Sequence, residues 1–254
     1  MVRTLRRSYR IGLLSLHLLV GLLLAYGMGR ARSTEPPAPG QWRLIQWWLR
    51  RAGRIVGLRI TVHGRSPQGA VLAAANHISW LDILVLSSVL PVCFVSKAEV
   101  RDWPVVGTLA SSSGTLFLNR GGRDAASRMT GQIGAYLRQG QSVLIFPEAT
   151  TGDGHGVRRF HARLFGAAIE AAAPVLPIAL RYPHPEGVNP LVPFIGHISF
   201  GAHAWRILGE HRVDAEVYLL EPIVPTDTDR KGLARRTHAA VEAVVTQATP
   251  QESP

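Results

Sequence analysis

The sequence predicts an α/β fold, a mostly parallel sheet flanked by helices, with an N-terminal membrane-anchoring helical segment. Three observations lead to this expectation. From Leu58 onward, short apolar runs alternate with longer helix-like stretches, as they do in α/β sheets. Residues 11–29 are apolar except for Ser15 and His17, a composition that suits lipid. The length of 254 residues allows one catalytic domain plus an appendage, with a substantial buried core.

The first apolar segment, residues 11–29, has close to the roughly 20 residues that cross a bilayer. A cleaved secretory signal is the alternative, because Gly27 and Gly29 offer small residues for cleavage. Against cleavage, the apolar core is long for a signal peptide, and arginines return at once with Arg30 and Arg32. We therefore expect a retained membrane anchor. Spanning the bilayer and lying in one leaflet are both compatible with its length.

Basic residues flank this segment on both sides. Four arginines precede it: Arg3, Arg6, Arg7 and Arg10. Six follow it: Arg30, Arg32, Arg43, Arg50, Arg51 and Arg54. The positive-inside tendency therefore favours a catalytic domain that faces the cytoplasm. The formal net charge is +11, and because the arginines form no long tract, it fits a membrane surface better than nucleic acid.

Residues 41–55 predict an amphipathic helix. Their tryptophans, leucines and arginines suit a helix that lies in the headgroup plane of a membrane. An ordinary helix packed on the domain is the alternative. With the segment before it, this helix makes residues 1–57 an N-terminal membrane anchor.

Residues 58–225 are expected to form the catalytic domain, with a motif core at 71–182, followed by a C-terminal helix and tail at 226–254. The expected strands are 58–63, 71–76, 92–96, 115–119, 142–146, 175–181 and 215–220. The expected helices are 81–90, 105–112, 124–138, 162–172 and 230–246. The only cysteine, Cys93, lies in an apolar run and is expected to be a core residue; a nucleophilic role is the alternative.

Residues 76–82 place His77 and Asp82 five positions apart, between two apolar runs. If the first run is a strand and the second a helix, His77 lies at the carboxyl end of the strand, where open α/β sheets bind ligands. Asp82, in the first turn of the helix, can then accept a hydrogen bond from the imidazole. The other ring nitrogen is left to take a proton from a hydroxyl, as acyl transfer to an alcohol requires. The alternative is a capping pair, in which Asp82 satisfies helix amides and His77 is simply buried.

Three further polar residues, Lys97, Arg120 and Glu148, each follow an apolar strand. Arg120 can hold a phosphate or a carboxylate by paired hydrogen bonds. Glu148 can bind a hydroxyl or an amine of an acceptor, or hold an arginine. Lys97 can contact a charged head group. For each of them, the alternative is a solvated strand end or a simple turn.

In this order, these segments resemble the motifs of the lysophospholipid acyltransferase family, which includes the 1-acylglycerol-3-phosphate acyltransferases. The first motif, N-H-x-x-x-x-D, is matched by Asn76, His77 and Asp82. The second, roughly G-x-x-F-x-x-R, is matched by the residues Gly114, Phe117 and Arg120. The third, F-P-E-G-T-R, is matched in part by the residues Phe146, Pro147, Glu148 and Thr150, with Ala149 and Thr151 in place of glycine and arginine. The fourth, a proline-containing apolar strand, looks like residues 175–179, so the resemblance covers about residues 58–182.

The resemblance implies that His77 is the general base on the acceptor hydroxyl and that Asp82 orients it. It implies neither a metal ion nor another cofactor. The donor would be a thioester of acyl carrier protein or of coenzyme A, and the acceptor a lysolipid at a membrane. The residues expected to contact substrate are Asn76, Lys97, Arg120, Glu148, Thr150 and Thr151.

Thr151 bears on the identity of the acceptor, because glycerophosphate-type members carry at this position an arginine thought to help bind phosphate. A threonine hydroxyl cannot replace a bidentate cation, although Arg158 or Arg159 can compensate. Residues 148–154 and 163–167 look more like the bacterial branch that acylates lyso-ornithine lipid. Lysophosphatidate and lyso-ornithine lipid are therefore the two expected acceptors.

Functions of other classes stay open on the sequence alone. A lipid hydrolase would use the same histidine and aspartate on water, but the sequence has no G-x-S-x-G nucleophile motif. A non-catalytic membrane-binding protein explains the charge and the amphipathic segment, but not residues 76–82. A nucleic-acid binder explains the charge alone and would require salt-sensitive retention of DNA.

Overall fold

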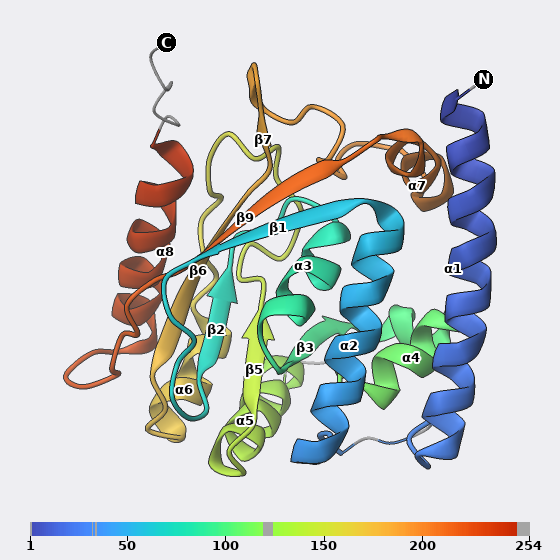
Figure 1. The fold of residues 1–254 in the computed structure, drawn as a ribbon. Helices are drawn as coiled ribbons and strands as arrows, with labels where there is room; N and C mark the ends of the chain where they lie inside the picture. Colours follow the sequence, from blue (N-terminus) through green and yellow to red (C-terminus); the bar gives the residue numbers. More distant parts are fainter. Residues whose placement is uncertain (1, 32, 34, 119–123, 248–254) are drawn as a thin grey trace.

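A seven-stranded sheet forms the centre of the computed structural model, which describes residues 2–31, 33, 35–118 and 124–247 (Figure 1). The strand order is β1-β9-β6-β2-β5-β3-β4. The strands are β1 (Leu58–His63), β2 (Leu72–Ala75), β3 (Val92–Lys97), β4 (Leu116–Leu118), β5 (Ser142–Ile145), β6 (Val175–Arg181) and β9 (Val213–Leu219). Neighbouring strands are parallel except for β6 and β9, so the predicted mostly parallel sheet is confirmed.

Helices cover both faces of this sheet. They are α1 (Val2–Gly27), α2 (Pro39–Val56), α3 (Leu81–Val89), α4 (Val106–Ser112), α5 (Ala125–Arg138), α6 (Gly166–Glu170), α7 (Phe200–Gly209) and α8 (Arg230–Thr246). One core cluster joins the sheet to α3 and α7, and the other joins it to α5, α6 and α8. In Figure 1, α1 and α2 stand side by side along one flank of the domain, where they contact each other.

The central strand β2 is built of small residues. Ala73 and Ala75 belong to one core cluster, and Leu72 and Ala74 belong to the other, as the period-2 geometry of a strand requires. All four side chains are fully buried. The carboxyl end of β2 is therefore fixed between its neighbours β6 and β5, at the middle of the sheet.

The structure differs from the sequence prediction mainly at three places. The helix α7 was not expected, although Ser199 accepts a hydrogen bond from Ala202 N as an N-cap does. The expected helix at 162–172 is a 3₁₀ turn, Arg163–Phe165, followed by the short α6. The apolar segment expected at 11–29 lies within a longer helix that begins at Val2 and ends at Gly27, because arginine is a good helix former and the apolar boundary is not the helical boundary.

Candidate active site

Three adjacent strands end at the same edge of the sheet and supply the candidate site. His77 follows β2, Glu148 follows β5 and Tyr182 follows β6, and the first turn of α3 supplies Asp82. Carboxyl ends of parallel strands are the usual position of ligand sites in open α/β sheets. The structure therefore brings the predicted pair His77 and Asp82 together at the expected edge.

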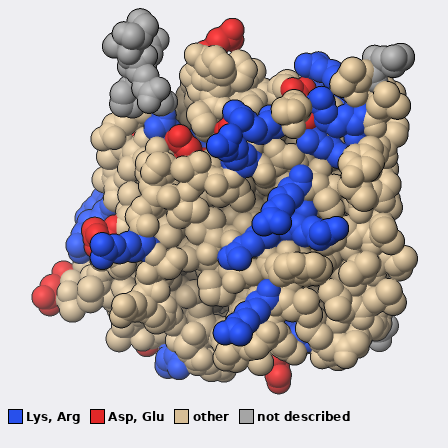
Figure 2. Space-filling model, in the orientation of Figure 1, with Lys and Arg blue, Asp and Glu red and all other residues tan. Residues whose placement is uncertain are grey.

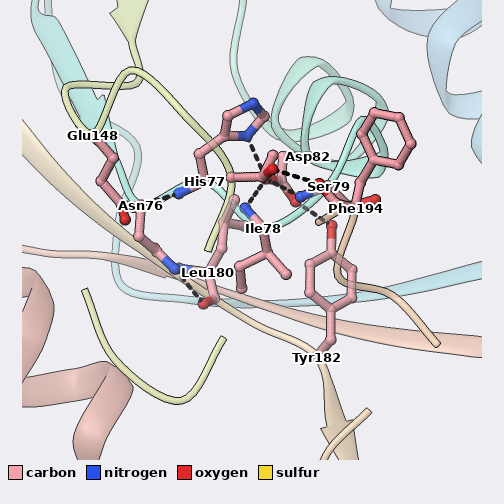
Figure 3. A network of polar contacts seen from close by, with 10 residues as sticks. Asn76, His77, Ile78, Ser79, Asp82, Glu148, Leu180, Tyr182 and Phe194 are labelled. Carbon is pink, nitrogen blue, oxygen red and sulfur yellow. Dashed lines mark hydrogen bonds and ion pairs between the residues drawn. The ribbon is translucent and has the colours of Figure 1, made fainter. Parts of the chain in front are cut away.

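The carboxylate of Asp82 is fully buried and lies 2.8 Å from His77 Nδ1 through its Oδ2 atom (Figure 3). The same oxygen accepts the backbone N–H groups of Ile78, at 2.7 Å, and Ser79, at 3.0 Å. Its Oδ1 atom accepts the hydroxyl of Tyr182 at 2.6 Å. Because Nδ1 faces a carboxylate oxygen, it carries the proton, and Nε2 of His77 keeps a free lone pair. The capping contacts and the histidine contact thus coexist on one carboxylate.

Two residues that follow β5, Phe146 and Glu148, also contact His77. The ring of Phe146 stacks on His77, with 4.0 Å between ring centroids and 16° between planes. Glu148 accepts the backbone N–H of His77 on Oε1 at 2.8 Å and that of Arg158 on Oε2 at 2.9 Å. Burial raises the pKa of Glu148, and those two amides oppose the rise. Glu148 thus ties the loop after β5 to the histidine.

Asn76 joins two strands. Its Nδ2 atom donates to Leu180 O at 3.0 Å, and its Oδ1 atom accepts from Leu180 N at 2.7 Å. The side chain is buried, so these two bonds extend the pairing of β2 with β6 by one step. Because the Asn76 side chain is buried, the structure favours a role in placing its neighbour His77 over a direct contact with a substrate.

The loop after β5, residues 146–158, is fastened to the histidine loop. Gly152 N donates to His77 O at 2.7 Å, and the hydroxyl of Thr151 donates to Phe194 O. Phe194 N in turn donates to Ile78 O at 2.9 Å. The Thr151 hydroxyl is therefore engaged within the protein, whereas Thr150 is exposed.

Ala149, in this loop, has a φ of 59°, in the left-handed region. The corresponding family position is a glycine, the residue that adopts this conformation without strain. The alanine therefore adopts this turn at the cost of backbone strain.

Two further predicted site residues are Lys97 and Arg120, and a nucleophilic role is the alternative for Cys93. Lys97 is exposed at the end of β3, two strands from β2, or about 10 Å across the sheet. Arg120 lies outside the described residues. Cys93 is fully buried, and burial raises its pKa to about 12, so its thiol stays protonated and is a core residue as expected. Within the described ranges, no group of three or more His, Cys, Asp or Glu side chains could hold a metal ion.

Tyr182 and Phe146 contact the histidine–aspartate pair but were not predicted as site residues. Phe146 lies within the third motif, so the sequence alone could have identified it as a site residue. Tyr182 comes one residue after β6 and exactly 100 positions after Asp82, so only the strand order shows that they meet.

A hollow of about 400 Å³ opens beside this loop. Its lining residues are Gly152, Asp153, His155, Gly156, Val157 and Arg158. Gly152 connects it to the backbone of His77, and its charged residues Asp153 and Arg158 have opposite signs. The hollow can therefore receive a polar group beside the loop that contacts His77.

Comparison with known proteins gives concordant matches. The family model described as Acyltransferase matches residues 59–181. A lyso-ornithine lipid O-acyltransferase from Pseudomonas aeruginosa is 40% identical over 228 residues, 86% of this chain and 88% of that protein. A 1-acyl-sn-glycerol-3-phosphate acyltransferase from Neisseria gonorrhoeae is 35% identical over 191 residues, 75% of each chain. The crystal structure of the 1-acyl-sn-glycerophosphate (LPA) acyltransferase PlsC from Thermotoga maritima has the same fold, with a TM-score of 0.64 at 21% identity, covering 94% of this chain and 96% of that one.

Proposed function

This chain belongs to the acyltransferase family, and we propose that it moves a fatty acyl group from a thioester donor to the hydroxyl of a lysolipid. The observation that carries the proposal is the pairing of His77 Nδ1 with the buried Asp82, which leaves Nε2 free at the edge of the sheet. The donor is acyl carrier protein or coenzyme A carrying the acyl chain.

In the proposed reaction, Nε2 of His77 takes the proton of the acceptor hydroxyl. The oxygen attacks the thioester carbonyl, a C–O bond forms, and the C–S bond breaks. The leaving thiolate then takes the proton back from the imidazolium, which Asp82 stabilises meanwhile. Positioned proton transfer of this kind contributes about 10² to 10⁴ in rate.

Lyso-ornithine lipid is the acceptor that we put first. Thr151 presents no cation, and its hydroxyl already donates to Phe194 O. The hollow beside the loop is lined by both Asp153 and Arg158, which suits a head group that carries both an ammonium and a carboxylate. A phosphate would bind Arg158 but would be repelled by Asp153. Lysophosphatidate is the second candidate, because a relative named for that activity is 35% identical.

The N-terminal helix supports association with a membrane. Within the described residues, α1 is the one helix long and apolar enough to cross a bilayer. One face of it contacts α2, α4 and α7. Its exposed large apolar residues are spread along its whole length: Val2, Leu5, Tyr9, Ile11, Leu16, Leu19, Leu23 and Tyr26. Because a helix packed lengthwise on its domain cannot cross a bilayer alone, we propose that α1 lies in one leaflet.

The adjacent helix α2 adds charge to this flank. Arg43, Arg50, Arg51 and Arg54 are exposed on it, together with Trp47. Figure 2 shows basic side chains in a diagonal row over this region, with few acidic ones between them. This composition suits anionic head groups, so we propose that the protein lies on the cytoplasmic face of a bacterial inner membrane.

The test uses membranes that carry the protein, labelled acyl carrier protein or acyl coenzyme A, and either lyso-ornithine lipid or lysophosphatidate. We expect labelled ornithine lipid from the wild type and at least about 100-fold less from His77→Ala. Product from lysophosphatidate alone would overturn the acceptor assignment. Released free fatty acid without acylated lipid would favour a hydrolase, and equal product from wild type and His77→Ala would overturn the mechanism.

A further inference from the structure

Tyr182 closes the polar network behind the candidate dyad. Its side chain is 1% exposed, and its hydroxyl lies 2.6 Å from Asp82 Oδ1. His77 faces the other carboxylate oxygen at 2.8 Å. Figure 3 shows the two side chains reaching the carboxylate from opposite sides.

The two oxygens of Asp82 are satisfied unequally. Oδ2 receives three donors, from His77, Ile78 and Ser79. Of the hydrogen bonds found among the described residues, Oδ1 receives only that of Tyr182. A buried carboxylate oxygen without a donor is costly, so loss of this hydroxyl would leave Oδ1 unsatisfied and the carboxylate less firmly held, while three donors keep Oδ2 toward His77.

Tyr182 is itself held firmly in place. Two residues earlier, Leu180 is bonded through both its N–H and its C=O to the side chain of Asn76. On the other side, Asn189 N donates to Tyr182 O at 2.9 Å. Burial and the charge of Asp82 keep the pKa of Tyr182 well above its usual value, so the phenol stays a donor at neutral pH.

We propose that Tyr182 is a positioning residue, which holds Asp82 in the orientation that faces His77 and draws negative charge away from the oxygen on the imidazole side. This inference rests on the proposed function, in which His77 acts as a base. Without the hydroxyl, the carboxylate presents more negative charge to His77 and stabilises the imidazolium. A higher pH is then needed to obtain the free base.

Other charged and titratable groups surround the dyad from the neighbouring elements. Glu148, from the loop after β5, holds the backbone of His77, and Arg158 binds Glu148 through its backbone. His203 of α7 accepts the indole N–H of Trp80, three residues after His77. None of these contacts involves Tyr182, so we assign a change in pH dependence of Tyr182→Phe to the hydroxyl.

The first test is Tyr182→Phe, with Tyr218→Phe as a matched control. Tyr218 also donates to a carboxylate, that of Glu216 at 3.0 Å, but it does so within β9. We expect kcat of Tyr182→Phe to fall by about 10- to 100-fold with little change in KM, as for loss of one hydrogen bond to a charged group. The acid limb of the kcat profile should move to higher pH. The control should keep both the rate and the profile.

A second variant tests how the Tyr182 hydroxyl changes the negative charge that Asp82 presents to His77, and it keeps the ring and the hydroxyl. Fluorotyrosine at position 182 keeps the ring and the hydroxyl but makes the phenol a stronger donor. The acid limb should then move to lower pH, opposite to the shift of Tyr182→Phe. If both variants keep the wild-type profile once the folded fraction is allowed for, Tyr182 is merely structural and the proposal is overturned.

An independent measurement separates this proposal from the acyl-transfer proposal. The imidazole NMR signal of His77, assigned with His77→Ala, can be titrated in the wild type and in Tyr182→Phe without any substrate. A shift of its titration to higher pH in Tyr182→Phe supports the role of Tyr182 even if neither acceptor is acylated. Identical titrations would refute it even if the enzyme is active.

Discussion

Two buried charged residues, one at the candidate active site and one on α1, follow the same physical rule. Asp82, at the sheet edge, is fully buried and accepts four hydrogen bonds. Arg10, on α1, is 9% exposed and donates to the carbonyl oxygens of Leu208, Glu210 and His211, at 3.2, 2.6 and 3.1 Å. In each case polar groups satisfy a charge that would otherwise be costly to bury.

The partners of these two charges differ. The difference distinguishes a proposed catalytic group, Asp82, from a residue that joins α1 to α7, Arg10. Asp82 accepts hydrogen bonds from two backbone amides a few residues away and from the side chains of His77 and Tyr182, both of which are titratable groups. Arg10 binds main-chain carbonyls about 200 positions away at the end of α7, none of which titrates. Arg6 and Arg7 add bonds to the same helix. We therefore expect changes at one region to leave the function of the other intact.

The largest effect is expected for Asp82→Asn. A neutral amide stabilises an imidazolium far less than a carboxylate does, and an NH₂ group at the Oδ2 position cannot accept the N–H groups of Ile78 and Ser79. We expect the single-turnover rate of acyl transfer to fall by about 10² to 10⁴. Co-sedimentation with anionic vesicles should stay at the wild-type level, since α1 is untouched. Loss of vesicle binding would mean that the two regions depend on each other.

The next effect is expected for Arg10→Met, which keeps the length of the stem but removes the donors. The free energy of unfolding in detergent should fall by about 2–3 kcal/mol, because carbonyls at the end of α7 lose charged partners. Arg3→Met is the control; Arg3 is 69% exposed and lies 3.7 Å from Glu210, so its loss should cost under about 1 kcal/mol. The rate of acyl transfer should stay close to wild type in both. A loss of rate as large as that of Asp82→Asn would contradict the expectation that changes on α1 leave the candidate active site intact.

A smaller effect is expected where α1 meets α2. A Cβ atom at Gly21 would come within 2.6 Å of the Trp48 ring, whereas one at Gly12 would meet nothing within 4 Å. Gly21→Ala should therefore destabilise the protein by about 1–3 kcal/mol, and Gly12→Ala should stabilise it by about 0.5–1 kcal/mol. Thermal unfolding of the two variants measures this difference. Equal shifts would show that α1 is not packed on Trp48 in solution.

The smallest effect is expected at Ala149, next to Glu148. Its φ of 59° is strained for alanine, and so is that of Ala172, at 48°, which lies away from the dyad. Glycine at either position should change the free energy of unfolding by under about 1 kcal/mol, with relief of strain opposed by chain entropy. Because Ala149→Gly restores the family residue without removing a contact, acyl transfer should stay within a few-fold of wild type in both variants. A large loss of rate in Ala149→Gly alone would show that the strain serves the reaction.

Local pattern was enough to predict most elements and the dyad itself. The alternation of short apolar runs predicts the strands of the sheet, because a strand buried on both faces reads as an apolar run. His77 and Asp82 could be paired because they are five positions apart at the end of such a run, where a turn into α3 brings them together. The helix α7, which is ten residues long, was missed, although Ser199 caps it; its contacts to Arg10 and Trp80 join it to distant parts of the chain.

The sequence by itself therefore determined the α/β class, the apolar N-terminal helix and the histidine–aspartate pair, since each depends on residues within one or two elements. The tertiary structure alone decided which distant groups complete that pair. Tyr182 contacts Asp82 because β6 lies beside β2. The Thr151 hydroxyl donates to Phe194 O because the loop after β5 lies against the loop that contains Phe194. Periodicity and turn chemistry act over a few residues, whereas contacts across 43 to 100 positions depend on strand order, which no local pattern encodes.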